Sequence, residues 1–197
     1  TIGWANDRGL KYHVLDAEAA GLMAEGVLSA TSGDPDKDGD RDLLVFTNEA
    51  ALLFINQGGF TFKRHADFSE RYGRLGGTGG QFADMDNDGD LDIVIADALR
   101  RDGGRGPALL INTWPEGGFI NAIEIDPGNM LSAINFPGNA SCVVADFTGN
   151  GNCDVLLAPI GAKPFFVENI TPGGHWIEID HRGMREQDKK TRSNNSR

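Results

Sequence analysis

The sequence predicts an all-β protein built from repeated hairpin units, and three observations indicate this. Short apolar runs typical of strands alternate with Gly- and Asp-rich turns along most of the 197 residues. A nine-residue motif rich in Asp or Asn occurs three times, at 34–42, 84–92 and 146–154. Each copy leads directly into an apolar run, at 43–46, 93–96 and 155–158. Each motif is therefore expected to form the turn of a β-hairpin.

The first two motifs have the composition of calcium-binding loops, with an acidic residue at every odd position and Gly at position six. Carboxylates at positions 1, 3 and 5 converge on one hard cation, position 7 offers its main-chain carbonyl, and the glycine permits the sharp turn. Position 12 is apolar in both copies, so the closing carboxylate is expected at position 9. The expected ligands are Asp34, Asp36, Asp38, Asp40 and Asp42 in the first loop, and Asp84, Asp86, Asp88, Asp90 and Asp92 in the second.

The third motif is a neutral variant of the same pattern. It keeps Asp at positions 1 and 9 and Gly at position 6, with uncharged oxygen donors between them. Its expected ligands are Asp146, Thr148, Asn150, Asn152 and Asp154. Lower charge weakens the attraction for a divalent ion, so we expect two strong Ca²⁺ sites and one weaker site.

The alternative interpretation is that these motifs are acidic, solvated turns, because Asp and Gly are favoured in any turn. Five carboxylates within nine residues repel one another strongly in the absence of a cation. Two copies with identical spacing are also hard to obtain from turn preference alone. Both arguments favour calcium.

The units match beyond the loops, which start 50 and then 62 residues apart. A second apolar run follows at 51–56, 108–112 and 164–169, and a third at 60–63, 119–125 and 175–179. With the strand that enters each loop, typified by 142–145, each unit has four antiparallel strands. Repeats of this length and composition predict a β-propeller segment of about three four-stranded antiparallel blades with calcium-binding hairpin loops.

The repeats divide the chain as follows. We expect the last strand of a preceding blade and a connection at 1–25, blades at 26–75, 76–126 and 127–174, and a separate segment at 175–197. Closed propellers need four to eight blades. We therefore expect this chain to be a piece of a longer protein and to pack against the remaining blades of the same propeller.

The segments GDPDKDGDRDLLV, ADMDNDGDLDIVI and ADFTGNGNCDVLL resemble the FG-GAP or VCBS repeat. That resemblance covers about residues 26–170 and implies a propeller fold similar to the integrin alpha head. The tail, from HWIEIDHRG at 175–183 to RSN at 192–194, resembles the start of the ASPIC/UnbV domain. That domain follows such repeats in cartilage acidic protein and its bacterial relatives, and here the resemblance ends with the chain.

Composition favours an extracellular binding scaffold. The formal net charge of −11 argues against nucleic acid, and 12 of the 29 acidic residues lie within the three loops, so a large share of the acidity is accounted for by the expected metal ligands. No apolar run approaches the roughly 20 residues that a membrane span needs. We expect a secreted or cell-surface protein, periplasmic or extracellular if bacterial, whose ligand is an extracellular protein or a glycan.

No catalytic constellation is recognisable. The four histidines lack metal-ligand spacing, and neither a nucleophile elbow nor a phosphate-binding loop is present. The expected function is adhesion or ligand binding without enzyme chemistry. The alternatives are a carbohydrate-binding or glycan-active propeller, lectin- or polysaccharide lyase-like, whose active part lies outside this chain, and a purely structural spacer.

Two further features of the sequence are left open. Cys142 and Cys153 flank the third loop, where either a disulfide or two buried thiols would fit. Asn139, Asn169 and Asn194 lie in glycosylation sequons.

Overall fold

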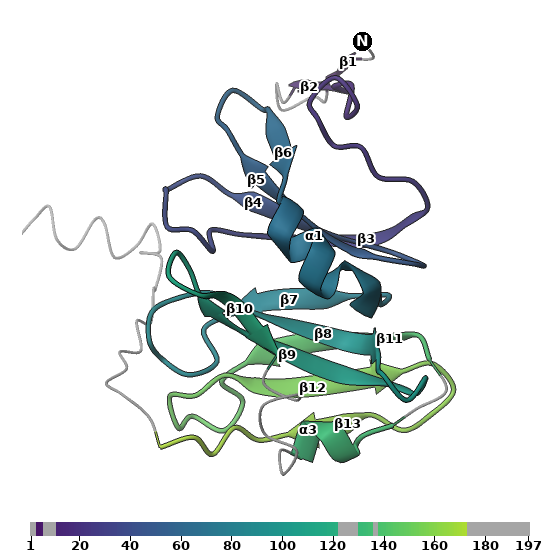
Figure 1. The fold of residues 1–197 in the computed structure, drawn as a ribbon, viewed down its shortest axis with the longest axis vertical. Coiled ribbons are helices and arrows are strands. Elements are labelled where there is room, and N and C mark those ends of the chain that lie inside the picture. Colours follow the sequence, from purple (N-terminus) through teal and green to yellow (C-terminus); the bar gives the residue numbers. More distant parts are fainter. Residues whose placement is uncertain (1–2, 6–10, 122–129, 136–137, 173–197) are drawn as a thin grey trace, which may run out of the picture.

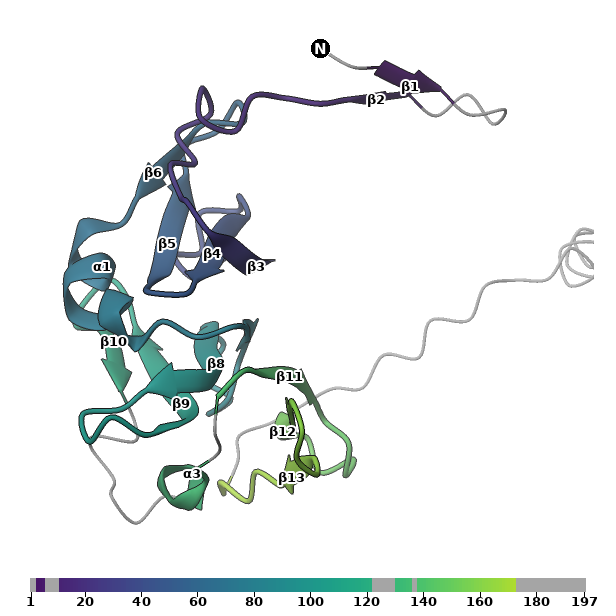
Figure 2. The ribbon, with the colours of Figure 1, turned by 90° about the vertical axis from the view of Figure 1, so that its right-hand side faces the viewer.

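A computed structural model describes residues 3–5, 11–121, 130–135 and 138–172. Within these residues the chain forms three antiparallel sheets of three or four strands, which lie one after another along a curved path (Figures 1 and 2), and a small two-stranded sheet. The predicted all-β, blade-like class is confirmed. No helix in this part of the chain is long and apolar enough to cross a membrane.

Each sheet follows the predicted order of strands, and neighbours in sequence are neighbours in space. The first sheet contains β3 (Val27–Gly33), β4 (Asp42–Thr47), β5 (Ala51–Asn56) and β6 (Phe62–Arg64). The second contains β7 (Gly80–Ala83), β8 (Asp92–Leu99), β9 (Arg105–Thr113) and β10 (Gly118–Asn121). The third contains β11 (Ala140–Ala145), β12 (Asp154–Pro159) and β13 (Phe165–Val167).

Parts of the expected pattern fall outside the described residues. These are the end of the third run of the second unit at 122–125, the fourth strand of the third unit at 175–179, and the tail that resembles the ASPIC/UnbV domain.

The N-terminal residues form a small separate sheet. In it, β1 (Gly3–Ala5) pairs with β2 (Lys11–His13), and the pair stands away from the first blade in Figure 2. The following segment does contact the blade. Ala20 and Leu22 pack with Val45 and Phe54, and the Ala20 carbonyl accepts a 2.7 Å hydrogen bond from the nitrogen of Phe62.

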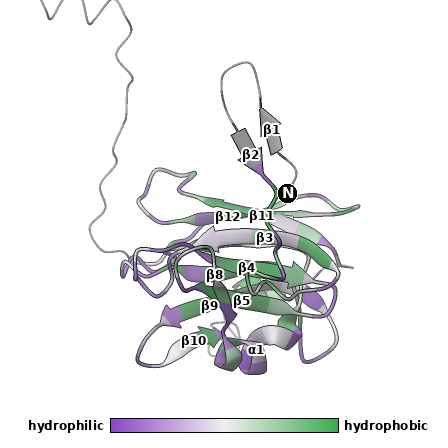
Figure 3. Ribbon diagram, turned by 90° about the horizontal axis from the view of Figure 1, so that it is seen from above, coloured by the Kyte–Doolittle hydropathy of each residue, from purple (hydrophilic) through white to green (hydrophobic). Residues whose placement is uncertain are grey.

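The core lies between the sheets. Strand β8 is covered on both faces, which explains why the apolar run at 93–96 is continuous rather than alternating. Ile93 and Ile95 point to the first blade and pack in one cluster with Phe46. Val94 and Ala96 point the opposite way and pack against the third blade. Because side chains alternate along a strand, a sheet covered on both faces needs apolar residues at every position. The hydrophobic strands and hydrophilic loops are visible in Figure 3.

Short helices occupy the connections, where the sequence predicts none. They are α1 (Ala66–Tyr72), the 3₁₀ turn η1 (Gly73–Leu75) and α3 (Met130–Ala133). His65 caps α1, because its Nδ1 accepts a hydrogen bond of 3.0 Å from the nitrogen of Phe68. Phe68 and Leu75 complete the core between the first two blades.

A glycine at the start of β7 allows the first two blades to approach closely. A Cβ on Gly80 would lie 2.4 Å from the Val94 carbonyl oxygen and 2.6 Å from a ring carbon of Phe46. Neither neighbour is free to move, since both residues are buried. This position therefore requires glycine for packing.

Candidate metal centres

The three Asp- and Asn-rich loops join the first two strands of each blade and lie along one side of the stack (Figure 1). Each loop is folded around the aspartate at its first position. Asp34 Oδ2 accepts a hydrogen bond from the Gly39 nitrogen at 3.1 Å, and Asp84 Oδ2 accepts one from Gly89 at 3.0 Å. Asp146 Oδ2 accepts the equivalent bond from Gly151 at 2.9 Å. These glycines have φ near +90°, so the turn suits glycine best.

In the first loop, the carboxylates of Asp34, Asp36 and Asp42 converge. One oxygen from each lies within 4.8 Å of the others. Two oxygens bound to the same calcium ion at about 2.4 Å can be no more than about 4.8 Å apart, so this cluster has the size of a calcium site. Asp42 is fully buried, and its Oδ2 has no hydrogen-bond partner in the part of the chain that the structure describes.

In the second loop, the converging carboxylates are those of Asp84, Asp86 and Asp88, again within 4.8 Å of one another. Asp84 Oδ1 and Asp86 Oδ1 are buried atoms without a hydrogen-bond partner among the described residues. Buried polar atoms are normally satisfied, and an unexplained acceptor in an all-oxygen cluster suits a hard cation.

The raised pKa values of aspartates in both loops agree with the fit of these carboxylate clusters to a calcium ion. Burial raises the pKa of Asp42 to about 6 and that of Asp92 to about 7. Burial also raises the pKa of Asp36 and Asp86, with neighbouring carboxylates adding to the shift. Desolvation outweighs the main-chain hydrogen bonds that Asp42 and Asp92 accept, whereas a divalent cation would favour the ionised forms of these carboxylates.

The third loop differs, because main-chain amides satisfy its two carboxylates and neither has a buried oxygen without a partner among the described residues. Asp146 accepts from Gly149 at 2.7 Å, from Asn150 at 3.2 Å and from Gly151, and these amides lower its pKa, with Gly151 the largest contributor. Asp154 Oδ2 accepts from the nitrogens of Phe147 and Thr148 at 3.0 and 3.1 Å. The loop is therefore held in shape by its own amides, and its role as a weaker calcium site stays a prediction.

The position 9 carboxylates have a second role that the ligand pattern did not reveal. Asp42, Asp92 and Asp154 each accept a 2.8 Å hydrogen bond from the main-chain nitrogen of an asparagine that ends the second apolar run; the three asparagines are Asn56, Asn112 and Asn169. Asp92 Oδ2 also accepts from the Met85 nitrogen at 2.7 Å, so both its oxygens are bound by protein. The sequence signal was an Asn at the same place in all three units.

The position 5 aspartates differ between the loops, because Asp88 belongs to the second cluster whereas Asp38 is outside the first. Asp38 and Asp88 each accept from the main-chain nitrogen two residues later, at 2.8 Å in both cases. The side chains of Asp40 and Asp90, at position 7, stay outside the clusters, as a carbonyl donor would. The role of these residues as ligands remains a prediction.

The structure places the two cysteines and the glycosylation sequon at Asn169. Cys142 and Cys153 are free thiols that pack in the core between the second and third blades, and burial raises the pKa of Cys142 to about 12. Asn169 uses its side-chain amide to donate to the Met85 carbonyl at 2.8 Å, so a glycan attached there would compete with this contact.

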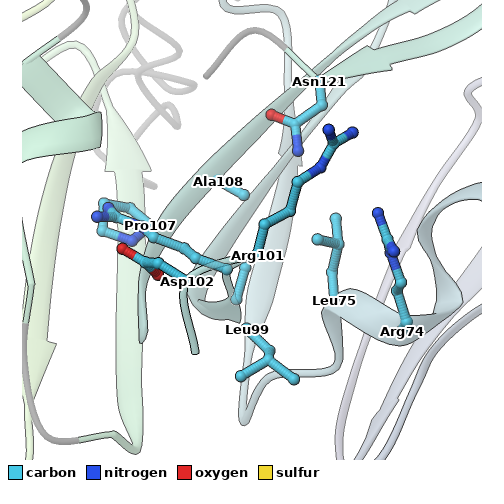
Figure 4. A pocket seen from close by; sticks show the side chains of 10 residues that line it. Arg74, Leu75, Leu99, Arg101, Asp102, Pro107, Ala108 and Asn121 are labelled. Carbon is cyan, nitrogen blue, oxygen red and sulfur yellow. The ribbon is translucent and has the colours of Figure 1, made fainter. Parts of the chain in front are cut away.

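A cavity of about 470 Å³ lies near the β8–β9 turn, at the end of the blade away from the loop (Figure 4). Arg101 extends toward Asn121, and Arg74 lies beside Leu75. The neighbouring Arg100 has a structural role, because it donates hydrogen bonds to the carbonyls of Leu131 and Ile134 at 2.9 and 2.6 Å.

Arg105, near the same turn, is structural as well. It donates to the carbonyl of the fully buried Asp97 at 3.0 Å. Arg100 and Arg105 therefore both hold main-chain carbonyls near the β8–β9 turn.

The comparison with known proteins agrees with the geometry of the loops. No curated protein matches the chain. Residues 34–95, from the first loop to the strand after the second, match the family model of the FG-GAP-like repeat.

Proposed function

We propose that the chain is a calcium-binding FG-GAP/VCBS propeller segment and that it serves as an extracellular scaffold for adhesion or ligand binding, without catalysis of its own. The observation that carries this proposal is the set of buried carboxylate oxygens without hydrogen-bond partners in the described part of both acidic loops, Asp42 Oδ2, Asp84 Oδ1 and Asp86 Oδ1. Each belongs to a cluster with the dimensions of a calcium site.

Calcium would stabilise the blades by removing an electrostatic cost. Carboxylates that are close together and partly desolvated repel one another, and a hard cation with oxygen ligands offsets this repulsion. The ion binds only the folded loop, so its binding free energy adds to the stability of the hairpin. Extracellular modules bind calcium with dissociation constants of about 0.1–1 mM, which is the basis for proposing a secreted or surface location.

The partner that we propose is an extracellular protein or a glycan. The tail motif is the basis for a further proposal, that an ASPIC/UnbV-like segment follows the blades. We do not favour the glycan-active alternative, whose active part would lie outside this chain; the Arg74 and Arg101 cavity, lined by one acid, Asp102, and no histidine, adds no support for it.

Calorimetric titration with CaCl₂ tests the calcium function, with MgCl₂ as the control. We expect two main binding events for calcium and weaker binding of magnesium, which demands stricter octahedral geometry. At about 100 times the dissociation constant, each site should add about 2.7 kcal/mol to the free energy of unfolding. Absence of binding heat together with an unchanged melting temperature would reject the proposal.

A further inference from the structure

We propose that the calcium loops of neighbouring blades are coupled, so that filling the loop at 34–42 raises the calcium affinity of the loop at 84–92. This inference rests on the proposed calcium function. It comes from two kinds of contact that recur between successive blades and join equivalent positions of the loops.

The first contact links position 4 of one loop to position 7 of the next. Lys37, at position 4 of the first loop, forms an ion pair with Asp90 at position 7 of the second. Asn87, at position 4 of the second loop, donates from Nδ2 to Asn152 Oδ1, at position 7 of the third, at 2.7 Å. The side chains differ but the positions are the same, so the contact belongs to the repeat geometry.

The second contact uses the asparagine that follows the loop hairpin. Asn112 Nδ2 donates to the Pro35 carbonyl of the first loop at 2.8 Å and to the Leu91 carbonyl of its own blade at 3.2 Å. Its main-chain nitrogen binds Asp92 Oδ1 at 2.8 Å. Asn112 is only 1% exposed, so this bridge between two loops is desolvated. In the third blade, Asn169 makes the matching bond to the Met85 carbonyl.

Both contacts join segments that an ion would order. Position 4 stands between ligand positions 3 and 5 and has left-handed backbone at Lys37 (φ 59°) and Asn87 (φ 60°). An ion that fixes positions 3 and 5 therefore fixes the direction of the position 4 side chain. That side chain holds position 7 of the next loop, whose carbonyl is the expected ligand there. Prior ordering by the first ion lowers the cost of binding the second.

Simple electrostatics predicts the opposite sign, which makes the inference testable. A calcium ion in the first loop adds two positive charges near the second loop and would weaken binding there. At 0.15 M salt the screening length is about 8 Å, which reduces this repulsion between solvent-exposed loops. A favourable effect of the first ion on the second site therefore requires the contacts.

Site-resolved NMR titration of the full chain with CaCl₂ at 0.15 M salt provides the measurement. The amides of Gly39 and Gly89 occupy equivalent hydrogen bonds to Asp34 and Asp84, so each reports on its own loop. Asp38→Ala removes the exposed position 5 carboxylate of the first loop. We expect this variant to raise the calcium concentration at the midpoint of the Gly89 curve by about fivefold, within the usual range of coupling between sites.

Lys37→Gly then tests the path of the coupling. Glycine tolerates the left-handed backbone and is the residue at the same position of the third loop, Gly149. In the Lys37→Gly background, Asp38→Ala should shift the Gly89 midpoint by clearly less than fivefold, as in a double-mutant cycle. Lys163→Gly, at an exposed position in the β12–β13 turn, is the control with the same change in charge and should preserve the full shift.

The outcomes separate the two proposals. If the midpoint of the Gly39 curve rises in Asp38→Ala while Gly89 titrates at the same or a lower calcium concentration, the coupling is refuted while the calcium sites stand. If neither glycine amide responds to calcium in the folded wild-type chain, the calcium function itself is refuted. An equal midpoint shift with and without Lys37 would overturn the assignment of the position 4 contact.

Discussion

Asp42 Oδ1 accepts a 2.8 Å hydrogen bond from the main-chain nitrogen of Asn56, whereas Asp42 Oδ2 is buried and no described residue donates to it. The equivalent aspartate of the second blade, Asp92, has both oxygens bound by main-chain amides. The same residue at the same repeat position therefore has two different environments, and substitutions at the two positions should have opposite effects.

Asp42→Asn is expected to stabilise the protein in the presence of a chelator. Asparagine keeps an oxygen for the Asn56 amide, removes a desolvated charge, and places an NH₂ donor beside Asp34 and Asp36. Asp92→Asn should instead destabilise by about 1–3 kcal/mol, because its NH₂ would face an amide donor. Melting temperatures in EDTA measure both effects, and Asp42→Asn should also lose most of the calcium-dependent shift. Destabilisation of both variants in EDTA would contradict this account of Asp42.

The pKa values of Asp42 and Asp92, raised by burial from 3.8 to about 6 and about 7, predict an unusual dependence of stability on pH. Without metal, the folded state holds these protons to higher pH than the unfolded state does. Stability is therefore greatest near pH 4 as far as these two groups are concerned, and falls as pH rises through 6–7. The limit is about 1.4 kcal/mol for each pH unit by which one pKa is raised.

Thermal melts between pH 5 and 8 check this prediction. In EDTA the melting temperature should fall with rising pH, and in saturating calcium the fall should be much smaller, because the ion favours the ionised carboxylates. Calcium affinity should decrease on acidification through the same range. A chelated protein that gains stability steadily from pH 5 to 8 would show that other groups dominate.

Loop positions 5 and 7 should differ in their effect on calcium binding. Asp88→Ala removes a carboxylate of the cluster and should abolish one binding event in calorimetry. Asp90→Ala keeps the main-chain carbonyl at position 7 and removes only the ion pair with Lys37, so it should reduce affinity much less. Equal losses for the two variants would argue against the proposed ligand set.

The sequence predicted the parts of this fold that depend on local pattern. Loop spacing, glycine positions and runs such as 93–96 were enough to place the hairpins, since a strand covered on both faces reads as an unbroken apolar run. The same pattern named the carboxylates that converge in the first two loops, Asp34, Asp36 and Asp42 and then Asp84, Asp86 and Asp88. The role of the expected residues as calcium ligands stays a prediction.

What the sequence did not predict depends on contacts between blades. In the sequence, Asn112 is only the last residue of an apolar run. Its side-chain amide donates to the carbonyl of Pro35, 77 residues earlier, and this contact between blades explains why an amide is needed at position 112. Helix α1 was missed because it is only seven residues long, although the spacing of Phe68, Tyr72 and Leu75 was a helical signal. Short elements of this kind are fixed by packing rather than by propensity.

The third loop offers a test by gain of function. Its backbone already has the calcium-loop fold, because Asp146 and Asp154 accept amide bonds like those in the other loops. It lacks negative charge at positions 3 and 5, where Thr148 and Asn150 stand exposed. The double substitution Thr148→Asp and Asn150→Asp restores the four-carboxylate set of positions 1, 3, 5 and 9.

We expect this double variant to acquire a third strong calcium-binding event in calorimetry. It should also melt at a lower temperature than the wild type in EDTA, because the added carboxylates repel Asp146 when no ion is present. Thr148→Asn with wild-type Asn150 is the control, since it supplies a neutral oxygen of similar size and should leave the affinity of this loop low. If the double variant binds calcium no better than this control, low charge is not what limits calcium binding by the third loop. The main-chain amides that bind Asp146 and Asp154 would then be what keeps these two carboxylates from turning toward an ion.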